Sequence, residues 1–214
     1  HELKTPITSI KSYTETLLDG AMDDKDTATS FLNVINSESD RMNSIIKDLL
    51  QLSHMDYKKE SWDMSMTDIN SLTRDCILKM KLYADKKNQS IIDEISDDTL
   101  PVIIDKSKFE QVIINLISNA IKYTNNDGTI IVKTYTTGNK CHICVSDNGI
   151  GIPKKDLPFI FDRFYRVDKG RSRSLGGTGL GLSICESIIA EHGGKISVTS
   201  TLGKGSTFTV TIPM

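Results

Sequence analysis

The chain has 214 residues and a formal net charge of −2, and 38% of its residues are hydrophobic and 25% charged. These values are typical of a globular protein with enough chain for a sizeable core, and the slight negative charge argues against nucleic acid as the main partner. No apolar run approaches the roughly 20 residues that span a bilayer, and no signal peptide is recognisable. We therefore expect a soluble chain that contacts neither nucleic acid nor membrane.

The first 56 residues are predicted to form two helices joined by a short acidic turn. Apolar residues from Leu3 to Leu17 recur in steps of three and four, and those from Phe31 to Leu52 recur at heptad-like spacing. Such spacing gathers the apolar side chains along one stripe of each helix. Gly20 lies in the acidic run and breaks the helix there. The predicted unit is a helical hairpin.

The apolar stripe of this hairpin needs a partner surface. A single hairpin cannot cover both sides of the stripe, whereas two hairpins paired about a twofold axis form a four-helix bundle. The alternative is that the stripe packs on the chain's own C-terminal region. We favour a homodimer because the heptad pattern continues along the whole second helix.

The rest of the chain is predicted to be an α+β sandwich, with helices packed on one side of a mixed sheet. A long stretch rich in Gly, Pro and charged residues, 148–178, is expected to be a functional loop. We place one domain at 1–58 and a second at 59–214. The expected elements are helices 69–86, 105–123 and 180–192 and strands 90–95, 101–104, 129–136, 140–146, 195–201 and 206–212.

The four cysteines include one C-x-x-C pair, Cys141 and Cys144. Such a pair is found in zinc sites and in redox proteins, but a second metal-ligand pair is missing from the sequence. The stretch is also predicted to be a strand, where positions three apart face opposite sides. We therefore expect reduced cysteines in a core, as in a cytoplasmic protein.

Two asparagines lie four residues apart in the predicted helix 105–123. Asn115 and Asn119 share one helical face, and Lys122 and Tyr123 follow on nearby faces. Amide oxygens at this spacing can ligate a hard cation that holds phosphates, and the lysine adds charge. The alternative is an ordinary exposed polar face. It is disfavoured because the asparagines are surrounded by apolar residues and a buried amide without a partner costs about 1–3 kcal/mol.

Glycine-rich turns follow two later elements. Asp147 ends a predicted strand, and a buried carboxylate suits the exocyclic amine of adenine, with Gly149 and Gly151 allowing close backbone approach. Alone, such a turn is also ordinary. A second glycine-rich turn, 176–181, precedes a predicted helix and can direct backbone N–H groups at an anion. Neither standard phosphate-binding fingerprint is present, so a different kind of nucleotide pocket is expected.

The chain begins His1-Glu2-Leu3-Lys4-Thr5, which differs from the zinc-protease pattern H-E-x-x-H at its fifth position. Glu2 can hold one ring nitrogen of His1 and raise the nucleophilicity of the other. Thr5 lies one helical turn further on the same face, where its hydroxyl can orient a water molecule. The pattern is consistent with a phosphoryl acceptor.

Taken together, these segments resemble the cytoplasmic catalytic region of two-component sensor histidine kinases. The resemblance covers essentially the whole chain, and five motifs occur in the family's order. They are the H box (HELKTPITSI), the N box (109–124), the first glycine box (147–152), the F box (159–168) and the second glycine box (176–184). The family implies a dimerisation and phosphotransfer hairpin followed by an ATP-binding domain of the kind shared with Hsp90, MutL and gyrase.

The resemblance also implies a role for each matching residue. His1 would be the phosphoacceptor, Glu2 its acid/base neighbour, and Thr5 the residue that helps to hydrolyse the phosphorylated response regulator. Asn119 would ligate magnesium, with Asn115 close by. The remaining positions would contact phosphates (Lys122, Arg166), contact adenine (Tyr123, Asp147) or shape the pocket and its lid (Gly149, Gly151, Gly177, Thr178, Gly179, Leu180, Gly181).

The sequence is thus interpreted as an ATP- and Mg²⁺-dependent protein-histidine kinase. It would autophosphorylate, pass the phosphoryl group to an aspartate of a cognate response regulator, and act as that regulator's phosphatase. Because the family's H box continues upstream of its histidine, we expect this chain to be the cytoplasmic portion of a membrane-anchored sensor, truncated at its first helical turns. Two alternatives are an ATPase of the same fold without phosphohistidine, and a dimerising scaffold that binds nucleotide without turning it over.

Overall fold

A computed structural model describes residues 3–56, 61–167 and 177–214 of the chain. Within these ranges a helical hairpin is followed by an α+β sandwich, so that part of the predicted fold is confirmed. The expected boundary between 1–58 and 59–214 lies outside the described residues, within 57–60. The helices are α1 Lys4–Leu18, α2 Lys25–Asp56, α3 Ile69–Asp85, α4 Lys106–Tyr123 and α6 Gly181–Glu191. The strands are β1 Met64–Asp68, β2 Ser90–Glu94, β3 Pro101–Asp105, β4 Thr129–Thr137, β5 Lys140–Asp147, β6 Lys195–Thr201 and β7 Gly205–Pro213.

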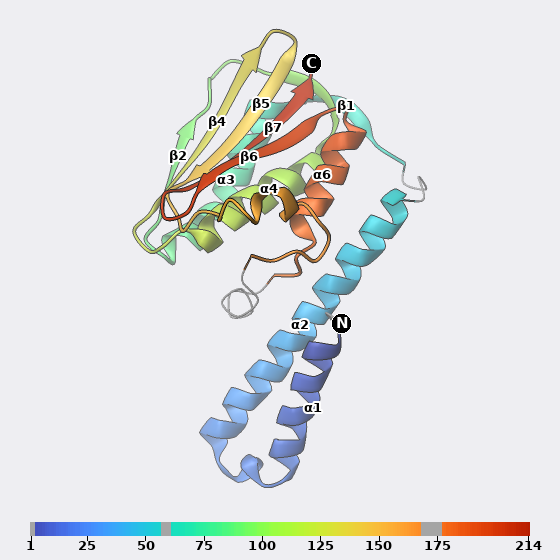
Figure 1. The fold of residues 1–214 in the computed structure, drawn as a ribbon, viewed down its shortest axis with the longest axis vertical. Coiled ribbons are helices and arrows are strands. Elements are labelled where there is room, and N and C mark those ends of the chain that lie inside the picture. Colours follow the sequence, from blue (N-terminus) through green and yellow to red (C-terminus); the bar gives the residue numbers. More distant parts are fainter. Residues whose placement is uncertain (1–2, 57–60, 168–176) are drawn as a thin grey trace.

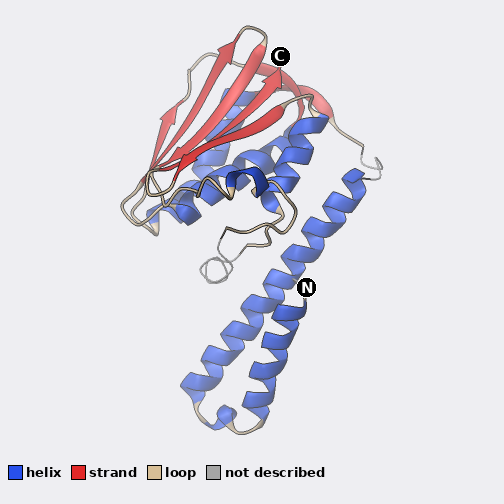
Figure 2. Ribbon diagram, in the orientation of Figure 1, coloured by secondary structure: helices blue, strands red, loops and turns tan. Residues whose placement is uncertain are grey.

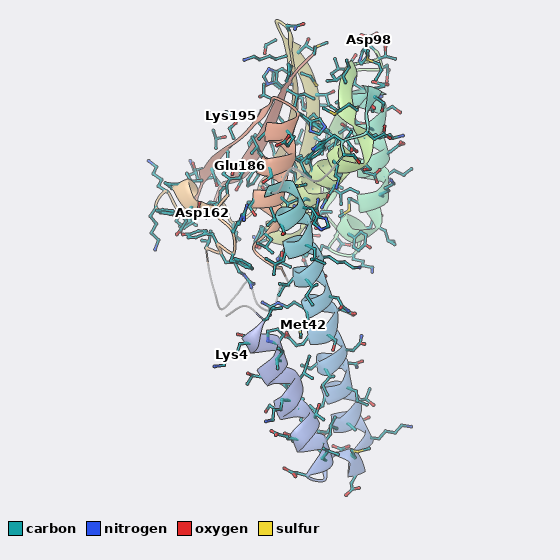
Figure 3. The ribbon with its side chains drawn as sticks, turned by 90° about the vertical axis from the view of Figure 1, so that its right-hand side faces the viewer. Lys4, Met42, Asp98, Asp162, Glu186 and Lys195 are labelled. Carbon is teal, nitrogen blue, oxygen red and sulfur yellow. The ribbon has the colours of Figure 1, made fainter. Side chains whose placement is uncertain are left out.

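The hairpin consists of a short helix, α1, packed against the first half of a long one, α2. The chain reverses direction at Gly20, which has a φ of 117°. Glycine adopts this backbone angle readily, whereas other residues would be strained there. The rings of Tyr13 and Phe31 pack across the two helices with centroids 5.0 Å apart. Figure 3 shows Lys4, the first residue of α1, near the level of Met42 on α2. The second half of α2 therefore extends beyond α1.

This second half of α2 packs on the sandwich. Leu52 and Met55 are buried in the same hydrophobic core as α4 and α6. The C-terminal part of the apolar stripe therefore packs on the chain's own C-terminal region, which was the alternative to pairing with a second hairpin. Heptad spacing predicts that a helix face is buried, but it does not predict which surface buries it. Other apolar side chains of the hairpin stay exposed in the single chain, among them Ile7, Leu18, Leu32, Ile46 and Leu50.

The sandwich has a five-stranded sheet in the order β2-β4-β5-β7-β6, covered on one face by helices (Figures 1 and 2). The sheet is mixed, as predicted, because β2 and β4 pair in parallel and the other neighbours are antiparallel. Alternating side chains of β4 and β5, such as Ile130, Val132, Ile143 and Val145, point into the core. A separate antiparallel pair, β1 with β3, was not predicted.

Helix α4 forms the centre of the helical layer and carries the predicted asparagines. Asp105 caps its N-terminus by accepting the N–H groups of Ser107 and Lys108, each at 3.1 Å. At its C-terminus, Lys87 Nζ donates to the carbonyl oxygens of three residues of the last turn, and Gln89 Nε2 donates to carbonyls of the same turn. Both ends of α4 are therefore fixed. Within the described ranges, no helix is both long and apolar enough to cross a bilayer.

Polar contacts of Asp48 and Gln51 join the hairpin to the sandwich. Thr178, just before α6, donates its hydroxyl to Asp48 Oδ2 on α2 at 2.7 Å. The amides of Gln51 on α2 and Gln111 on α4 exchange two hydrogen bonds, at 2.8 and 2.9 Å. With the apolar contacts of Leu52, these bonds hold the sandwich against the second half of α2.

We predict that Asp48→Ala combined with Gln51→Ala releases this docking. A hydrogen bond to a charged group contributes about 1.5–3 kcal/mol, so the loss of the Asp48 bond alone should shift the docked-to-undocked ratio by about 10- to 100-fold. Small-angle X-ray scattering should report a larger radius of gyration for the double variant. Lys47→Ala, an exposed neighbour on α2, serves as the control and should leave the radius unchanged. Equal radii for all three proteins would mean that these bonds do not hold the two parts together.

Candidate functional site

Four predicted site residues lie on one side of the C-terminal half of α4. Asn115, Asn119, Lys122 and Tyr123 are half-buried there, at spacings that place them on adjoining faces of the helix. The two asparagines are hydrogen bonded to each other, since Asn119 Nδ2 donates to Asn115 Oδ1 at 3.3 Å. Asn115 Nδ2 in turn donates to Cys185 Sγ, also at 3.3 Å. Asn119 is therefore the outer amide of the pair, and Asn115 lies behind it.

These amides fit a hard cation such as Mg²⁺. With the amide N–H groups bonded within the protein, Asn119 Oδ1 receives no donor from any described residue, and an amide oxygen is a ligand that Mg²⁺ accepts alongside phosphate oxygens and water. Across the described ranges, no group of three or more His, Cys, Asp or Glu side chains is arranged to hold a metal ion. A metal at Asn119 would accordingly need further ligands from a bound phosphate or from water.

A group of cations lies beside these amides. The pKa of Lys122 is lowered to about 8, because burial disfavours its charged form and because Arg166 and Arg41 add like charge nearby. Burial raises the pKa of the neighbouring Tyr123, and the charge of Arg166 opposes that shift. Lys122 Nζ lies over the Tyr123 ring, 5.2 Å from its centroid. Concentrated positive charge of this kind is suited to a polyanion such as a triphosphate.

The lowered pKa of Lys122 predicts pH-dependent nucleotide binding. In the free protein the ammonium loses its proton as the pH rises through about 8, so between about pH 7 and 9 the affinity for ATP should fall about tenfold. Lys122→Arg keeps its charge throughout this range, so its affinity should stay nearly constant. Fluorescence titration with ATP at several pH values measures both proteins. A flat profile for the wild-type protein would rule out Lys122 as a phosphate-binding cation.

Asp147 is positioned at the end of β5, beside the C-terminus of α4. Its Oδ1 accepts the Gly149 N–H at 2.9 Å, and burial raises the pKa of the carboxyl group while N–H donors from Gly149 and Ser206 oppose the shift. Ile150 donates its N–H to the Tyr123 carbonyl at 3.1 Å. At Gly149 a Cβ would lie 2.3 Å from that same carbonyl oxygen, so only glycine permits this approach. The turn after β5 is thus bonded directly to the helix that carries Asn119.

A small pocket of about 190 Å³ opens beside Asp147, at the turn between β6 and β7. Its lining includes the hydroxyl groups of Ser200 and Ser206, which lie 2.9 Å from each other. Ser200 Oγ also accepts the Ile152 N–H at 2.8 Å. Sequence reasoning missed both serines. The only available signal was the glycine-containing turn Gly203-Lys204-Gly205, which brings the ends of two strands next to Asp147.

The second glycine-rich turn contacts both the cation group and the hairpin. Gly177 lies next to Lys122, and the Thr178 hydroxyl, besides contacting Asp48, accepts the Leu180 N–H at 3.2 Å. Leu180 is fully buried in the core, so it anchors the start of α6. The other predicted glycines pack tightly against neighbours: Gly151 against Thr201, Gly179 against Phe164 and Gly181 against Asn115.

The hairpin residues of the predicted site are only partly visible. His1 and Glu2 lie outside the described residues. Thr5 is exposed on the first turn of α1 and lines an open groove of about 530 Å³ together with Lys4, Thr8, Ser9, Ser12 and Tyr13. The groove is lined mainly by polar side chains.

Three of the four cysteines lie in the core as predicted, and Cys144 does not. All four are free thiols; Cys76, Cys141 and Cys185 are buried, and Cys144 is half-exposed. Cys141 and Cys144 lie on β5, on opposite faces of the strand. Cys185 was predicted to be a plain core residue, and its contact with Asn115 was missed because no sequence pattern links α6 to α4.

Comparison with known proteins gives two family matches. Residues 104–214 match the family of histidine kinase-, DNA gyrase B- and HSP90-like ATPases. Residues 1–58 match the His Kinase A (phospho-acceptor) domain. Among solved structures, histidine kinase ThkA in complex with response regulator protein TrrA is similar at a TM-score of 0.81 and 30% identity, covering 100% of this chain and 59% of that one. Histidine kinase AdeS of Acinetobacter baumannii is similar at a TM-score of 0.78 and 26% identity, covering 100% and 98%.

Similar sequences lead to the same family. Sensor histidine kinase WalK of Bacillus subtilis (strain 168) is 44% identical over 217 residues, a match that covers 100% of this chain and 35% of that protein. A sensor protein kinase WalK of Staphylococcus aureus is 41% identical, covering 100% of this chain and 51% of that protein. This chain therefore spans about a third to a half of the length of these relatives. With a phospho-acceptor domain match on the hairpin and an ATPase match on the sandwich, the chain belongs to the sensor histidine kinases.

Proposed function

We propose that this chain transfers the γ-phosphoryl group of ATP to His1 and then to an aspartate of a response regulator. The observation that carries the proposal is the convergence of Asp147, Asn119 and Lys122 around the C-terminal half of α4. A carboxylate for adenine, an amide oxygen for a cation and a cation for phosphates are the groups that ATP needs. Residues 59–214 would bind the nucleotide, and 1–58 would accept the phosphoryl group.

The residues of the sandwich would bind and orient ATP. Asp147 would accept a hydrogen bond from the adenine amino group, with Tyr123 at the edge of the base. Lys122 and Arg166 would bind phosphate oxygens, and Gly177 would let the turn before α6 approach them. Asn119 would hold Mg²⁺, and the bound ion would neutralise the negative charge that develops on the phosphates during transfer. Most of the rate would then come from positioning and electrostatic stabilisation.

The residues of the hairpin would carry out the transfer. A ring nitrogen of His1 would attack the γ-phosphorus as the bond from that phosphorus to the bridging oxygen breaks, so that ADP leaves with the electron pair. Glu2 would hold the other ring nitrogen and its proton, which keeps the attacking nitrogen nucleophilic. Thr5, exposed one turn further along α1, would orient the water that hydrolyses a phosphorylated regulator.

The proposal also includes a homodimer, a response regulator as partner and a location in the cell. Exposed apolar side chains of the hairpin, such as Leu18 and Leu32, support a homodimer, because pairing two hairpins would remove them from water. A response regulator is supported by the likeness to ThkA, whose structure contains the regulator TrrA. The whole protein would be a membrane-anchored sensor with this chain on its cytoplasmic side; the likeness to sensor histidine kinase WalK, of which the chain spans 35%, supports a longer sensor protein.

The test is incubation with γ-labelled ATP and Mg²⁺, followed by treatment of the protein with acid or alkali. A phosphoryl group on histidine is lost in acid and retained in alkali. We expect such label in the wild-type protein and none in His1→Gln. ATP hydrolysis without protein-bound label would favour an ATPase of the same fold. Binding of ATP with neither label nor hydrolysis would favour a nucleotide-gated scaffold.

The assay should be repeated with the upstream helical turns of a relative such as WalK fused to residue 1, because this chain spans only 35% of that relative. Label that forms only in the extended chain would support the proposal. Failure of both chains to form label while binding ATP would overturn it.

A further inference from the structure

Three side chains from α4 and α6 form a hydrogen-bonded chain that ends at the proposed magnesium ligand. Asn119 Nδ2 donates to Asn115 Oδ1 at 3.3 Å, and Asn115 Nδ2 donates to Cys185 Sγ at 3.3 Å. The thiol lies 4.0 Å from the Val112 carbonyl oxygen, to which it donates in turn. All donors point in one direction along this chain, from Asn119 to Val112.

Cys185 is suited to the end of such a chain. It is 1% exposed on α6, and its pKa is raised to about 12 by burial, so the thiol keeps its proton and can accept and donate at once. A weak acceptor is sufficient here, because Asn115 Nδ2 lies against Cys185 and the first residue of α6. Valine or alanine at this position would leave that N–H group without a partner.

The direction of donation fixes the orientation of both amides. If Asn115 were rotated by half a turn about its terminal bond, its NH₂ group would face the NH₂ group of Asn119 and its oxygen would face the sulfur atom. The bond between the two amides would be lost, and the Cys185 thiol would have to leave the Val112 carbonyl to donate to the Asn115 oxygen. Gly181 at the start of α6 encloses the same side chain, since a Cβ there would lie 2.5 Å from Asn115 Nδ2. Asn115 is therefore held by bonding on two sides and by packing on a third.

We propose that Cys185 and Asn115 are positioning residues that turn Asn119 Oδ1 outward, toward the magnesium ion of the bound nucleotide. The inference rests on the proposed function, in which Asn119 is the protein's ligand to that ion. Asn119 Nδ2 is engaged by Asn115 Oδ1, so the amide presents its oxygen and not its NH₂ group to the site. An oxygen that is already oriented loses less conformational freedom when it binds a metal than a freely rotating one.

The experiment compares ATP affinity with Mg²⁺ and with EDTA, by isothermal titration calorimetry, in variants of Cys185. In the wild-type protein Mg²⁺ should tighten ATP binding. Cys185→Ala removes the acceptor, and a typical buried hydrogen bond predicts that the tightening falls about fivefold while the affinity in EDTA stays the same. Cys185→Ser retains a donor and acceptor and should keep the wild-type ratio within about twofold.

The matched control is Cys141→Ala, which shortens another fully buried cysteine, on β5. It should lower the midpoint of thermal unfolding about as much as Cys185→Ala without changing the effect of Mg²⁺. Loss of the Mg²⁺ effect in Cys141→Ala as well would assign the result to general loosening of the core and overturn the positioning role. In an Asn115→Ala background, Cys185→Ala should have no further effect on the Mg²⁺ ratio.

A second readout uses the metal-free protein. The side-chain NH₂ resonances of Asn115 and Asn119 should be separate and slow to exchange in wild type and in Cys185→Ser, and should both shift in Cys185→Ala. Unchanged Asn119 resonances in Cys185→Ala would overturn the inference. A different result would exclude the proposed function of Asn119 and leave the positioning role intact. In that case the resonances would behave as expected, but the wild-type protein would bind ATP equally with Mg²⁺ and with EDTA, so Asn119 would not be the metal ligand.

Discussion

Asp147→Asn is expected to weaken ATP binding by about 10- to 100-fold. The carboxylate lies half-buried beside the C-terminus of α4, where the N–H groups of Gly149 and Ser206 orient it. A charge-assisted hydrogen bond to the adenine amino group contributes about 1.5–3 kcal/mol, which corresponds to this loss of affinity. Burial raises the pKa of Asp147. As the pH is lowered, the affinity of the wild-type protein for ATP should therefore begin to fall at a higher pH than it would with an aspartate of ordinary pKa.

A change of ligand separates base recognition from a general disturbance of the fold. Purine riboside triphosphate has no exocyclic amine, so wild type should bind it more weakly than ATP. Asp147→Asn retains only a neutral amide oxygen as acceptor, so its preference for ATP should be clearly smaller than that of wild type. Glu191→Gln, which neutralises an exposed carboxylate at the end of α6, is the control and should keep the preference for ATP. If Asp147→Asn still preferred ATP as strongly as wild type, Asp147 would not be the group that reads the base.

Asn119→Ala is expected to remove the effect of Mg²⁺ and to reduce phosphohistidine formation by at least about 100-fold. A metal that neutralises phosphate charge contributes several kcal/mol to such a reaction, and every 1.4 kcal/mol is a factor of about ten in rate. ATP affinity should become the same with Mg²⁺ and with EDTA. Asn119→Asp keeps an oxygen ligand and should retain part of the Mg²⁺ effect.

Ser118 provides the control for this position, because it is exposed on the same helix and adjacent in sequence. Ser118→Ala should leave both the Mg²⁺ effect and the label unchanged. Thermal unfolding of Asn119→Ala should also remain close to wild type, since the residue is half-buried and its loss leaves the apolar face of α4 intact. Full label formation by Asn119→Ala would exclude this residue as the metal ligand.

Most of the fold could be predicted because its elements carry strong periodicity. The stripe on α4 and the alternation along β4 and β5 gave bounds within a residue or two of those observed. The pair of β1 and β3 was harder to predict, because three of the five residues of β1 are exposed and show no alternation. This strand is formed by pairing with β3, a contact distant in sequence.

The contact between the hairpin and the sandwich could not be predicted from the sequence, for a different reason. Leu52 belongs to a heptad stripe that suits either a second hairpin or the chain's own core, and spacing alone does not choose between them. In the structure the second half of α2 extends past α1, where α6 and the turn at Thr178 cover it (Figure 1).

The candidate site was predictable where a chemical group has to come from a particular residue type. The structure brings Asn119 and the turn after Asp147 to the same helix, α4, because Ile150 donates its N–H to the Tyr123 carbonyl, and their roles stay a prediction. The residues that support them were not predictable. Ser206 and Cys185 are ordinary residues of a strand and a helix, and only tertiary packing brings them against Asp147 and Asn115.

Transfer from the nucleotide site to the hairpin is tested most directly by locating the phosphoryl group in labelled protein. After reaction with ATP and Mg²⁺, the protein should be digested at alkaline pH, where phosphohistidine survives, and its peptides should be mapped by mass spectrometry. We predict one phosphorylated peptide, with the group on the imidazole of His1. A phosphoryl group on any other residue, or none on either this chain or the extended chain although both bind ATP tightly, would contradict a histidine kinase built from these two parts.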